Sequence, residues 1–350
     1  MRILFLRLPF ALLLLAGITP PAHADKLQSP WDGVRVTPTD APYACPAPPP
    51  FARTLEIGTY YTDSHASIAD PKKQAAFQRA SEDSTHLSQF AALAADAYLS
   101  QGSRAAALCV YSLLDAAAQA GAWDGKMPSF SGVYIQNWLL SAVAISYLKV
   151  RPSGLGTPAQ DAAIQRWFAT LAAQVRVYFD AEVVRLGIDR ENNHLYWAGL
   201  SVAAAGIADN DLEGFHWGVS AYRMGIDAIQ PDGSLKAEMN RAQMALHYHL
   251  YALAPLILLA ELGEANGLDL YAVDKGAIHR LVNFCLAGLE DPTLLQKRTG
   301  VVQLVTLPYA GSDIGWAVPY VRRFPNAQLS ALVAKAPWVR YTTWGGAPPQ

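Results

Sequence analysis

Apolar residues recur every three to four positions along most of this chain, which is the spacing of one face of an α-helix. The alternation of apolar and polar residues that marks a half-buried strand is nearly absent. Alanine, the best helix former, is abundant in the periodic segments. The pattern predicts eight helices, over residues 83–100, 103–120, 133–150, 158–182, 194–208, 212–229, 241–264 and 274–289.

Short turns rich in Gly, Pro and Asn separate these predicted helices, as at residues 151–154, 231–233 and 264–267. Long helices joined by short turns pack as antiparallel neighbours. We therefore expect an all-α protein whose helical hairpins form an α/α toroid, in which the inner helix ends line a groove. A plain multi-helix bundle is the alternative. The chain lacks an obvious internal linker, so one domain is expected over residues 25–350.

The beginning of the chain has the features of an export signal. Arg2 and Arg7 flank an apolar start, an apolar run follows, and Ala22-His23-Ala24 matches a small-residue cleavage site. Residues 1–24 are therefore expected to be a signal peptide, and the mature protein to be periplasmic or secreted. No later stretch is expected to form a membrane helix.

The lead-in after the signal, residues 25–52, is expected to be extended. It contains the run Y-A-C-P-A-P-P-P-F at residues 43–51, and proline at this density does not permit a helix. Three cysteines follow the signal peptide. Cys285 lies in an apolar helical pattern, whereas Cys45 lies in the proline-rich segment that needs anchoring. We predict a Cys45–Cys109 disulfide and a free Cys285 in an oxidising compartment.

The charge balance limits the classes of partner. The full chain has 27 basic and 29 acidic side chains, and the signal carries two of the arginines and no acid. The mature chain therefore has a net charge of about −4 at neutral pH. This argues against a nucleic-acid binder, which would need a basic surface. It leaves room for an anionic substrate held in one focused cleft.

The densest polar cluster is E-N-N-H-L-Y-W at residues 191–197, where an apolar helix begins. Asn192 or Asn193 could simply cap that helix, and His194 could be a hydrogen-bonded core residue. However, two amides, a histidine and two aromatic rings at one helix end are costly to bury without a function. His194 and Trp197 are three residues apart and are expected to share a helix face.

A second cluster covers residues 241–249. Arg241 and Tyr248 are seven positions apart, which places them two turns apart on one face of a continuous helix. A guanidinium beside a phenol lowers the cost of ionising it. The alternative is that Tyr248 is a half-buried aromatic residue and that Arg241 extends to water.

These residues carry a resemblance to a known family. Asn-His-x-Tyr-Trp at residues 193–197 resembles the N-N-H-S-Y-W motif of the alginate lyases of polysaccharide lyase family 5. Residues 238–251 resemble the family's E-L-K-R-x-Q-R-A-L-A-Y-H-N-Y run, and C-P-A-P-P-P-F at residues 45–51 resembles its lead-in. The match looks close to the broad-specificity polyuronate lyases. It implies an incomplete α/α toroid with a deep groove and cleavage of polyuronates such as poly-mannuronate by β-elimination.

The resemblance also implies roles for four residues. Asn193 would neutralise the C6 carboxylate of the substrate, with His194 beside it as base or carboxylate partner. Arg241 would hold the carboxylate or depress the pKa of the tyrosine. Tyr248 would give a proton to the leaving O4 and could also take the C5 proton. We expect a monomer that acts on an anionic polysaccharide without a cofactor.

Three positions depart from the family pattern. Tyr60 precedes Tyr61 where the family's lid has a basic residue, Met244 replaces the second arginine, and His247 replaces an alanine before Tyr248. Two cations are thus exchanged for an aromatic ring and a thioether. Glucuronate differs from mannuronate only at C2, so a looser pocket predicts poly-glucuronate and hyaluronan as further substrates.

Six residues are candidates for substrate binding. Tyr61, Trp138 and Trp197 are candidates to stack on sugar rings, and Tyr60 is expected beside Tyr61. Arg340 resembles the arginine of the family's F-R-L-G-G run. His247 is expected to line a subsite wall and to change charge near pH 6.5. No metal site is expected, because His247 and His249 point about 200° apart on a helix.

Two other function classes remain open. A glycoside hydrolase on the same architecture would need two carboxylates across the groove, and Asp189, Glu191 and Glu238 are available. A non-catalytic periplasmic polysaccharide-binding protein is the other alternative. Only a lyase leaves a C4–C5 double bond that absorbs in the ultraviolet.

Overall fold

The computed structural model describes residues 26–182 and 192–350. The predicted signal peptide lies outside these residues, as do Asp189 and Glu191. Within these described residues, the only β pairing is four isolated bridges. The predicted all-α class is confirmed.

Eight long helices correspond to the predicted ones. They are α1 (Pro71–Gln101), α2 (Arg104–Gln119), α3 (Phe130–Val150), α4 (Pro158–Val177), α6 (Asn193–Asp209), α7 (Leu212–Asp227), α9 (Ala245–Glu264) and α10 (Val273–Glu290). A π-helical turn, Tyr178–Glu182, continues α4. The sequence pattern missed four short helices, α8 (Lys236–Met239), α11 (Thr293–Thr299), α12 (Ala317–Arg323) and α13 (Ala327–Lys335).

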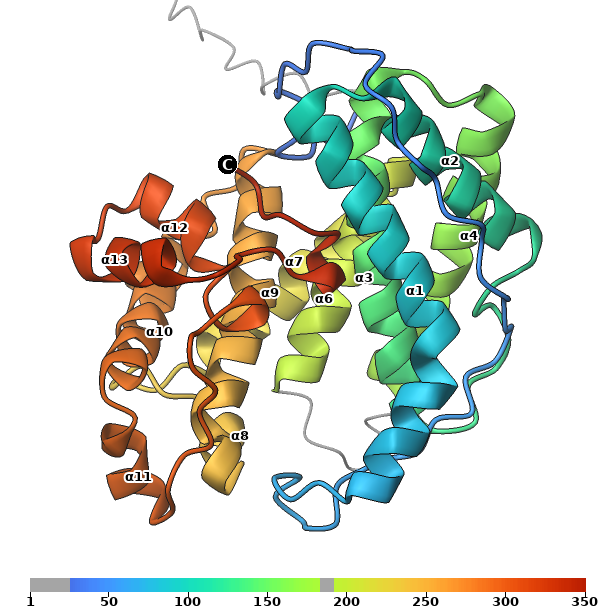
Figure 1. Ribbon diagram of the computed structural model, residues 1–350. Helices are drawn as coiled ribbons and strands as arrows, with labels where there is room; N and C mark the ends of the chain where they lie inside the picture. The colour runs from blue at the N-terminus through green and yellow to red at the C-terminus, as the bar shows by residue number, and fades with distance from the viewer. Residues whose placement is uncertain (1–25, 183–191) are drawn as a thin grey trace, which may run out of the picture.

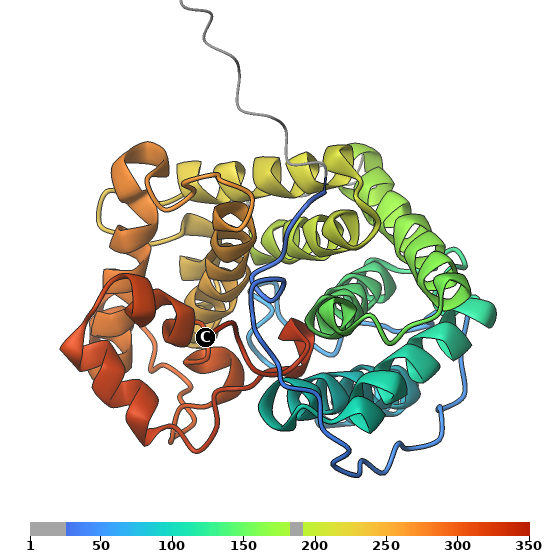
Figure 2. The same ribbon diagram turned by 90° about the horizontal axis from the view of Figure 1, so that it is seen from above.

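The long helices form two layers of an arc (Figures 1 and 2). α3, α6 and α9 are apolar on nearly every side and almost completely buried, which is the pattern of inner helices. α2, α4, α7 and α10 bury only one face and stand on the outside of the arc. The arrangement is the predicted incomplete α/α toroid, and α1 packs along α3 at one end of the arc.

α9 is the inner helix that carries Tyr248. Together with the turn before it, residues 242–264 are long and apolar enough to cross a membrane, but 94% of the most apolar 18 residues among them are buried inside the protein. Its apolar character is therefore explained by packing against α6, α7 and α10.

Two helices, α1 and α9, begin four or more residues away from the predicted position. α1 begins at Pro71, earlier than expected, because the Asp70 side chain accepts hydrogen bonds from the backbone N–H groups of Lys72 and Lys73. α9 begins later, because Ala242 has a positive φ of 48° and starts a 3-10 turn. Arg241 thus precedes the helix and is not part of it.

The disulfide prediction is confirmed. Cys45 and Cys109 are joined, with their Cα atoms 5.5 Å apart, and Cys285 is free and buried. The bond ties the extended proline-rich lead-in to the outer helix α2.

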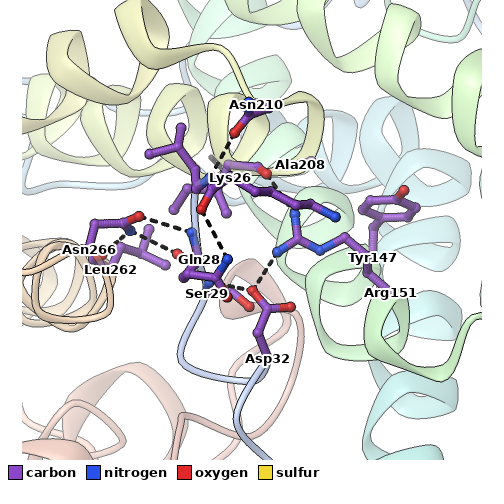
Figure 3. Close-up of polar contacts among 12 residues, drawn as sticks. Lys26, Gln28, Ser29, Asp32, Tyr147, Arg151, Ala208, Asn210, Leu262 and Asn266 are labelled. Carbon is purple, nitrogen blue, oxygen red and sulfur yellow. Dashed lines mark hydrogen bonds and ion pairs between the residues drawn. The ribbon is translucent and has the colours of Figure 1, made fainter. Parts of the chain in front are cut away.

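The start of the described chain crosses one end of the toroid and contacts residues that follow three of its helices (Figure 3). The backbone of residues 27–28 donates to the side-chain oxygens of Asn210 and Asn266 at 2.7 and 2.9 Å. Asn266 in turn donates to the carbonyl of residue 28 at 2.8 Å. Asp32 pairs with Arg151 at the end of α3. An extended segment, and not a further helix, therefore covers the turns that follow α3, α6 and α9.

A buried ion pair fixes the end of the chain against α1 and α3. Lys149, which is 0% exposed, donates to Asp96 at 2.8 Å and to the carbonyl of Gly345 at 2.5 Å. Asp96 also accepts from the backbone N–H of Ala347. Removing one partner of such a pair would leave the other charge buried and unpaired, which is strongly unfavourable. Because both side chains also bond to the backbone of the C-terminal segment, the pair holds this segment in place. This holds Tyr341 beside α9.

Candidate active site

A pocket of about 430 Å³ lies among α1, α3, α6 and α9, beneath the loop of residues 59–70, which we call the lid. Its wall is unusually rich in phenol groups and has Arg241 as the one cation among its described residues. No aspartate or glutamate is among these lining residues. The hydroxyl, imidazole and guanidinium side chains that line it are Thr59, Tyr60, Tyr61, Ser81, Thr85, Ser131, Tyr134, His194, Arg241, His247, Tyr248, Tyr251, Ser312 and Tyr341.

Tyr248, in the first turn of α9, is at the centre of the polar contacts in this pocket. Its hydroxyl lies 2.6 Å from the hydroxyl of Tyr61 in the lid, and the Arg241 guanidinium carbon lies 3.5 Å from its ring centre. Burial raises the pKa of Tyr248 to about 12, although Arg241 and the Tyr61 hydroxyl both act to lower it. The net effect is opposite to the expected depression, so Tyr248 is a protonated phenol at neutral pH.

Arg241 reaches Tyr248 by a different route from the predicted helix face. The turn at Ala242 brings its guanidinium back over the ring, as a cation on an aromatic face. Its Nη2 also donates to the carbonyl of Ala66 in the lid at 3.2 Å. Arg241 therefore links α9, through the Tyr248 ring, to the lid at Ala66.

His194 lines the same pocket from the start of α6. Asn192 caps this helix by accepting from the His194 backbone N–H at 2.9 Å, so the capping role predicted for the Asn pair is confirmed. The imidazole stacks on Tyr134 with ring centres 3.8 Å apart. Burial, and secondarily Arg241, lower the pKa of His194 to about 3, which keeps the ring neutral. Its buried Nδ1 has no hydrogen-bond partner among the described residues.

Asn193 is fully buried and does not line the pocket. Its backbone N–H donates to Glu238 Oε1 at 2.9 Å, and its Nδ2 contacts both Glu238 oxygens at 3.0 and 3.1 Å. In this structure its donors are therefore directed at Glu238. The role of Asn193 at a substrate carboxylate stays a prediction.

His247 lines the pocket between two tyrosines. Its ring stacks on Tyr251 at 5.9 Å and meets the Tyr248 ring edge-on at 5.1 Å. Burial, followed by Arg241, lowers the pKa of His247 to about 4. The expected change of charge near pH 6.5 is therefore wrong, because the site desolvates the imidazole.

The other sugar-stacking candidates divide into two groups. Tyr60, Tyr61 and Trp138 line the pocket, as expected. Trp197 does not: it is 0% exposed and its indole N–H donates to the carbonyl of Tyr251. Although Trp197 follows His194 by three residues, its ring packs against Tyr251 of α9 inside the core, so it does not reach the pocket.

Arg340 is exposed but lies outside this pocket, in an adjacent hollow. His249 faces the core: its Nδ1–H donates to Ala245 at 2.7 Å and its Nε2 accepts from the Leu235 N–H at 3.0 Å. Both ring nitrogens of His249 are thus occupied, so it cannot join His247 as a metal ligand.

Sequence reasoning missed three of the pocket tyrosines, Tyr134, Tyr251 and Tyr341. For Tyr134 a signal was available, because it precedes Trp138 by four residues and so shares its helix face. Tyr341 had none, since the buried Lys149–Asp96 pair brings its segment to the site from far along the chain.

Comparison with known proteins places this geometry in a family. Residues 55–294 match the family model described as alginate lyase. A polysaccharide lyase of Stenotrophomonas maltophilia (strain K279a) is 41% identical, over 84% of this chain and 87% of that protein. An alginate lyase of Pseudomonas syringae pv. syringae (strain B728a) is 31% identical, over 87% of this chain and 80% of that protein.

Solved structures share the fold. The crystal structure of alginate lyase A1-III from Sphingomonas species A1 superposes with a TM-score of 0.75 at 23% identity, over 94% of this chain and 97% of that one. A variant of alginate lyase A1-III complexed with a tetrasaccharide superposes with a TM-score of 0.78. From the family match and the two relatives, we conclude that this chain is a polysaccharide lyase that belongs to the alginate lyase family.

Proposed function

We propose that this enzyme cleaves 1,4-linked polyuronates by β-elimination, with poly-β-D-mannuronate as a substrate and Tyr248 as the proton donor to the leaving O4. The observation that carries the proposal is the pairing of the Tyr248 hydroxyl with Tyr61 beneath the Arg241 guanidinium. An acid catalyst must hold its proton until the glycosidic bond breaks. A phenol with a pKa of about 12 does so at neutral pH.

The reaction also needs a proton acceptor and a cation. The C5 hydrogen becomes acidic only when the charge of the neighbouring C6 carboxylate is balanced, and Arg241 is the cation of the described wall. His194 is neutral and has an unused Nδ1 in the same pocket. We assign the C5 proton to His194 and the O4 proton to Tyr248, after which a proton returns from His194 to the tyrosinate.

A contribution from Asn193 requires a rearrangement. Its carboxamide would have to exchange Glu238 for the substrate carboxylate, because both Nδ2 contacts are now with Glu238. We assign to Glu238 the task of positioning Asn193 before the substrate arrives.

The proposed substrate range is broad. Poly-glucuronate and hyaluronan are included because Tyr60, Met244 and His247 replace two cations and an alanine of the family pattern. Of these, Tyr60 and His247 line the pocket, and a neutral histidine there leaves the C2 substituent without a charged neighbour. We also propose that the enzyme acts as a monomer, without a cofactor, in the periplasm or outside the cell, where the Cys45–Cys109 bond is stable.

Hydrolysis is disfavoured by the make-up of the pocket. A glycosidase needs two carboxylates facing the scissile bond, and the described wall has none. Glu238, one of the three candidates, is buried and bonded to Asn193.

The test is an ultraviolet assay for unsaturated uronate ends, run on poly-mannuronate, poly-glucuronate and hyaluronan. Absorbance should rise with wild-type enzyme and stay flat with Tyr248→Phe. New reducing ends without absorbance would mean hydrolysis, and binding without either product would mean a binding protein.

A further inference from the structure

A second hollow, of about 850 Å³, adjoins the active-site pocket. It lies between α1, the loop of residues 306–313 and the segment of residues 337–342. Ser312 and Tyr341 line both cavities, so the two lie side by side along this shared wall. A polymer in the active-site pocket that continued past Tyr341 would enter this hollow.

Trp338 is the prominent side chain of the hollow. It is 58% exposed, although an indole is one of the largest apolar surfaces a protein can leave in water. Its backbone carbonyl accepts from the N–H of Gly311, which ties it to the opposite loop at 3.2 Å. Leu307 on that loop is 70% exposed. An open aromatic face beside other apolar groups suits the C–H face of a pyranose ring.

Arg340 supplies the charge that a uronate requires. The segment is extended here, so residues two apart, Trp338 and Arg340, project from the same side. In the described part of the chain no carboxylate pairs with Arg340, whereas Asp96 in the same wall is neutralised by Lys149. A guanidinium can grip a carboxylate through two parallel hydrogen bonds.

The described wall of the hollow has two acidic residues, Asp96 and Asp313, which a polyanion would meet. Burial raises the pKa of Asp313, which lowers the tendency of this carboxyl group to carry a charge. The segment itself is well fixed, because Tyr341 exchanges backbone hydrogen bonds with Gly346 and Lys149 holds Gly345. The hollow is thus preformed rather than dependent on lid closure.

We propose that this hollow is a distal subsite for the same polyuronate chain, in which Trp338 stacks on a sugar ring and Arg340 binds its carboxylate. The inference rests on the proposed function and extends it to substrate length. Chains long enough to span both cavities bind more tightly, whereas oligomers that fill only the active-site pocket gain nothing from Trp338.

The test compares Trp338→Ala and wild type on oligomannuronates of increasing length and on the polymer. Loss of one aromatic contact should raise KM for the polymer about tenfold, with kcat nearly unchanged. The shortest cleaved oligomer should be processed at the wild-type rate. Arg340→Ala should behave alike, and Arg35→Ala, which removes an exposed arginine outside both cavities, should have no effect.

Trp338→Phe keeps a smaller ring and should fall between wild type and alanine, with an unchanged melting temperature. An equal loss at all substrate lengths, or no loss at any, would overturn the subsite. Calorimetric binding of short and long oligomers to Tyr248→Phe, with and without Trp338→Ala, tests the subsite without turnover. A wild-type enzyme that fails the ultraviolet assay but shows this length-dependent binding would refute the proposed reaction and leave the subsite standing.

Discussion

The guanidinium carbon of Arg241 lies over the Tyr248 ring, 3.5 Å from its centre, yet the two residues do not share a helix. The positive φ of Ala242 ends the preceding turn and folds Arg241 back over α9. The same guanidinium donates to the lid at Ala66. One side chain therefore contacts both the Tyr248 phenol and the loop over the pocket.

Tyr248→Phe should abolish turnover while fold and polymer binding stay nearly intact. The ring keeps its packing and loses only the hydroxyl that supplies the proton, a change worth about 10²–10⁴-fold in rate. Ultraviolet kinetics and calorimetric binding measure the two effects. Tyr98→Phe, at a buried tyrosine of α1 outside the pocket, is the matched control and should retain activity. Substantial activity in Tyr248→Phe would remove Tyr248 from the mechanism.

Arg241→Lys should lose about 10²–10³-fold in kcat, even though the charge is kept. An ammonium cannot stack on the ring as a guanidinium does, nor hold two partners in a fixed plane. Arg241→Ala also removes the charge that lowers the pKa of Tyr248, so the phenol pKa should rise further. Ultraviolet difference titration of tyrosine would detect this, and a fall in the pKa would contradict the geometry.

The lid should become less mobile when substrate binds. Asp63 shapes this loop by accepting hydrogen bonds from the N–H groups of His65, Ser67 and Ile68. Hydrogen exchange over residues 59–70 should slow when an oligosaccharide binds Tyr248→Phe. Asp63→Ala removes these acceptors, at a cost of about 1 kcal/mol to the closed loop, and should raise KM. Unchanged exchange on binding would mean that the loop is not a lid.

His247→Phe should change the relative rates on poly-mannuronate, poly-glucuronate and hyaluronan far more than it changes stability. Phenylalanine can keep the stacking on Tyr251 while the two ring nitrogens in the pocket are lost. Because the pKa of His247 is about 4, the substrate preference of the wild type should stay constant between pH 6 and 8. Equal losses on all three substrates would assign His247 to structure alone.

Stability should fall on acidification below about pH 6.5. Burial lowers the pKa values of His194, His247 and His249 to about 3, 4 and 4, so the unfolded state takes up protons first. Between the unfolded pKa and these folded values, each step down in pH therefore favours unfolding. Urea unfolding at pH 7.5 and 5.0 measures this. In His249→Gln the difference between the two pH values should shrink, whereas an unchanged difference would locate the effect elsewhere.

The sequence pattern predicted the eight long helices, the toroid and the Cys45–Cys109 bond because each follows from local periodicity or from a simple choice of pairing. It placed Tyr60, Tyr61, Trp138, His194, Arg241, His247 and Tyr248 correctly at one pocket, through the resemblance to the family's motifs. It was wrong about Trp197, since helical spacing identifies a shared face but not whether an inner helix leaves that face open.

What the sequence determined by itself is therefore the set of long helices and the residue types of the site. Tertiary structure alone decided the protonation states of the site residues and which side chains lie at the pocket. Burial outweighs the charge of Arg241 at Tyr248 and keeps this phenol protonated, whereas at His247 burial and Arg241 act together to keep the ring neutral. Desolvation depends on every neighbour and not on spacing along one helix. The position of the exposed Trp338 could likewise not be predicted from the sequence. It depends on the Lys149–Asp96 pair, which holds the end of the chain at the side of the pocket.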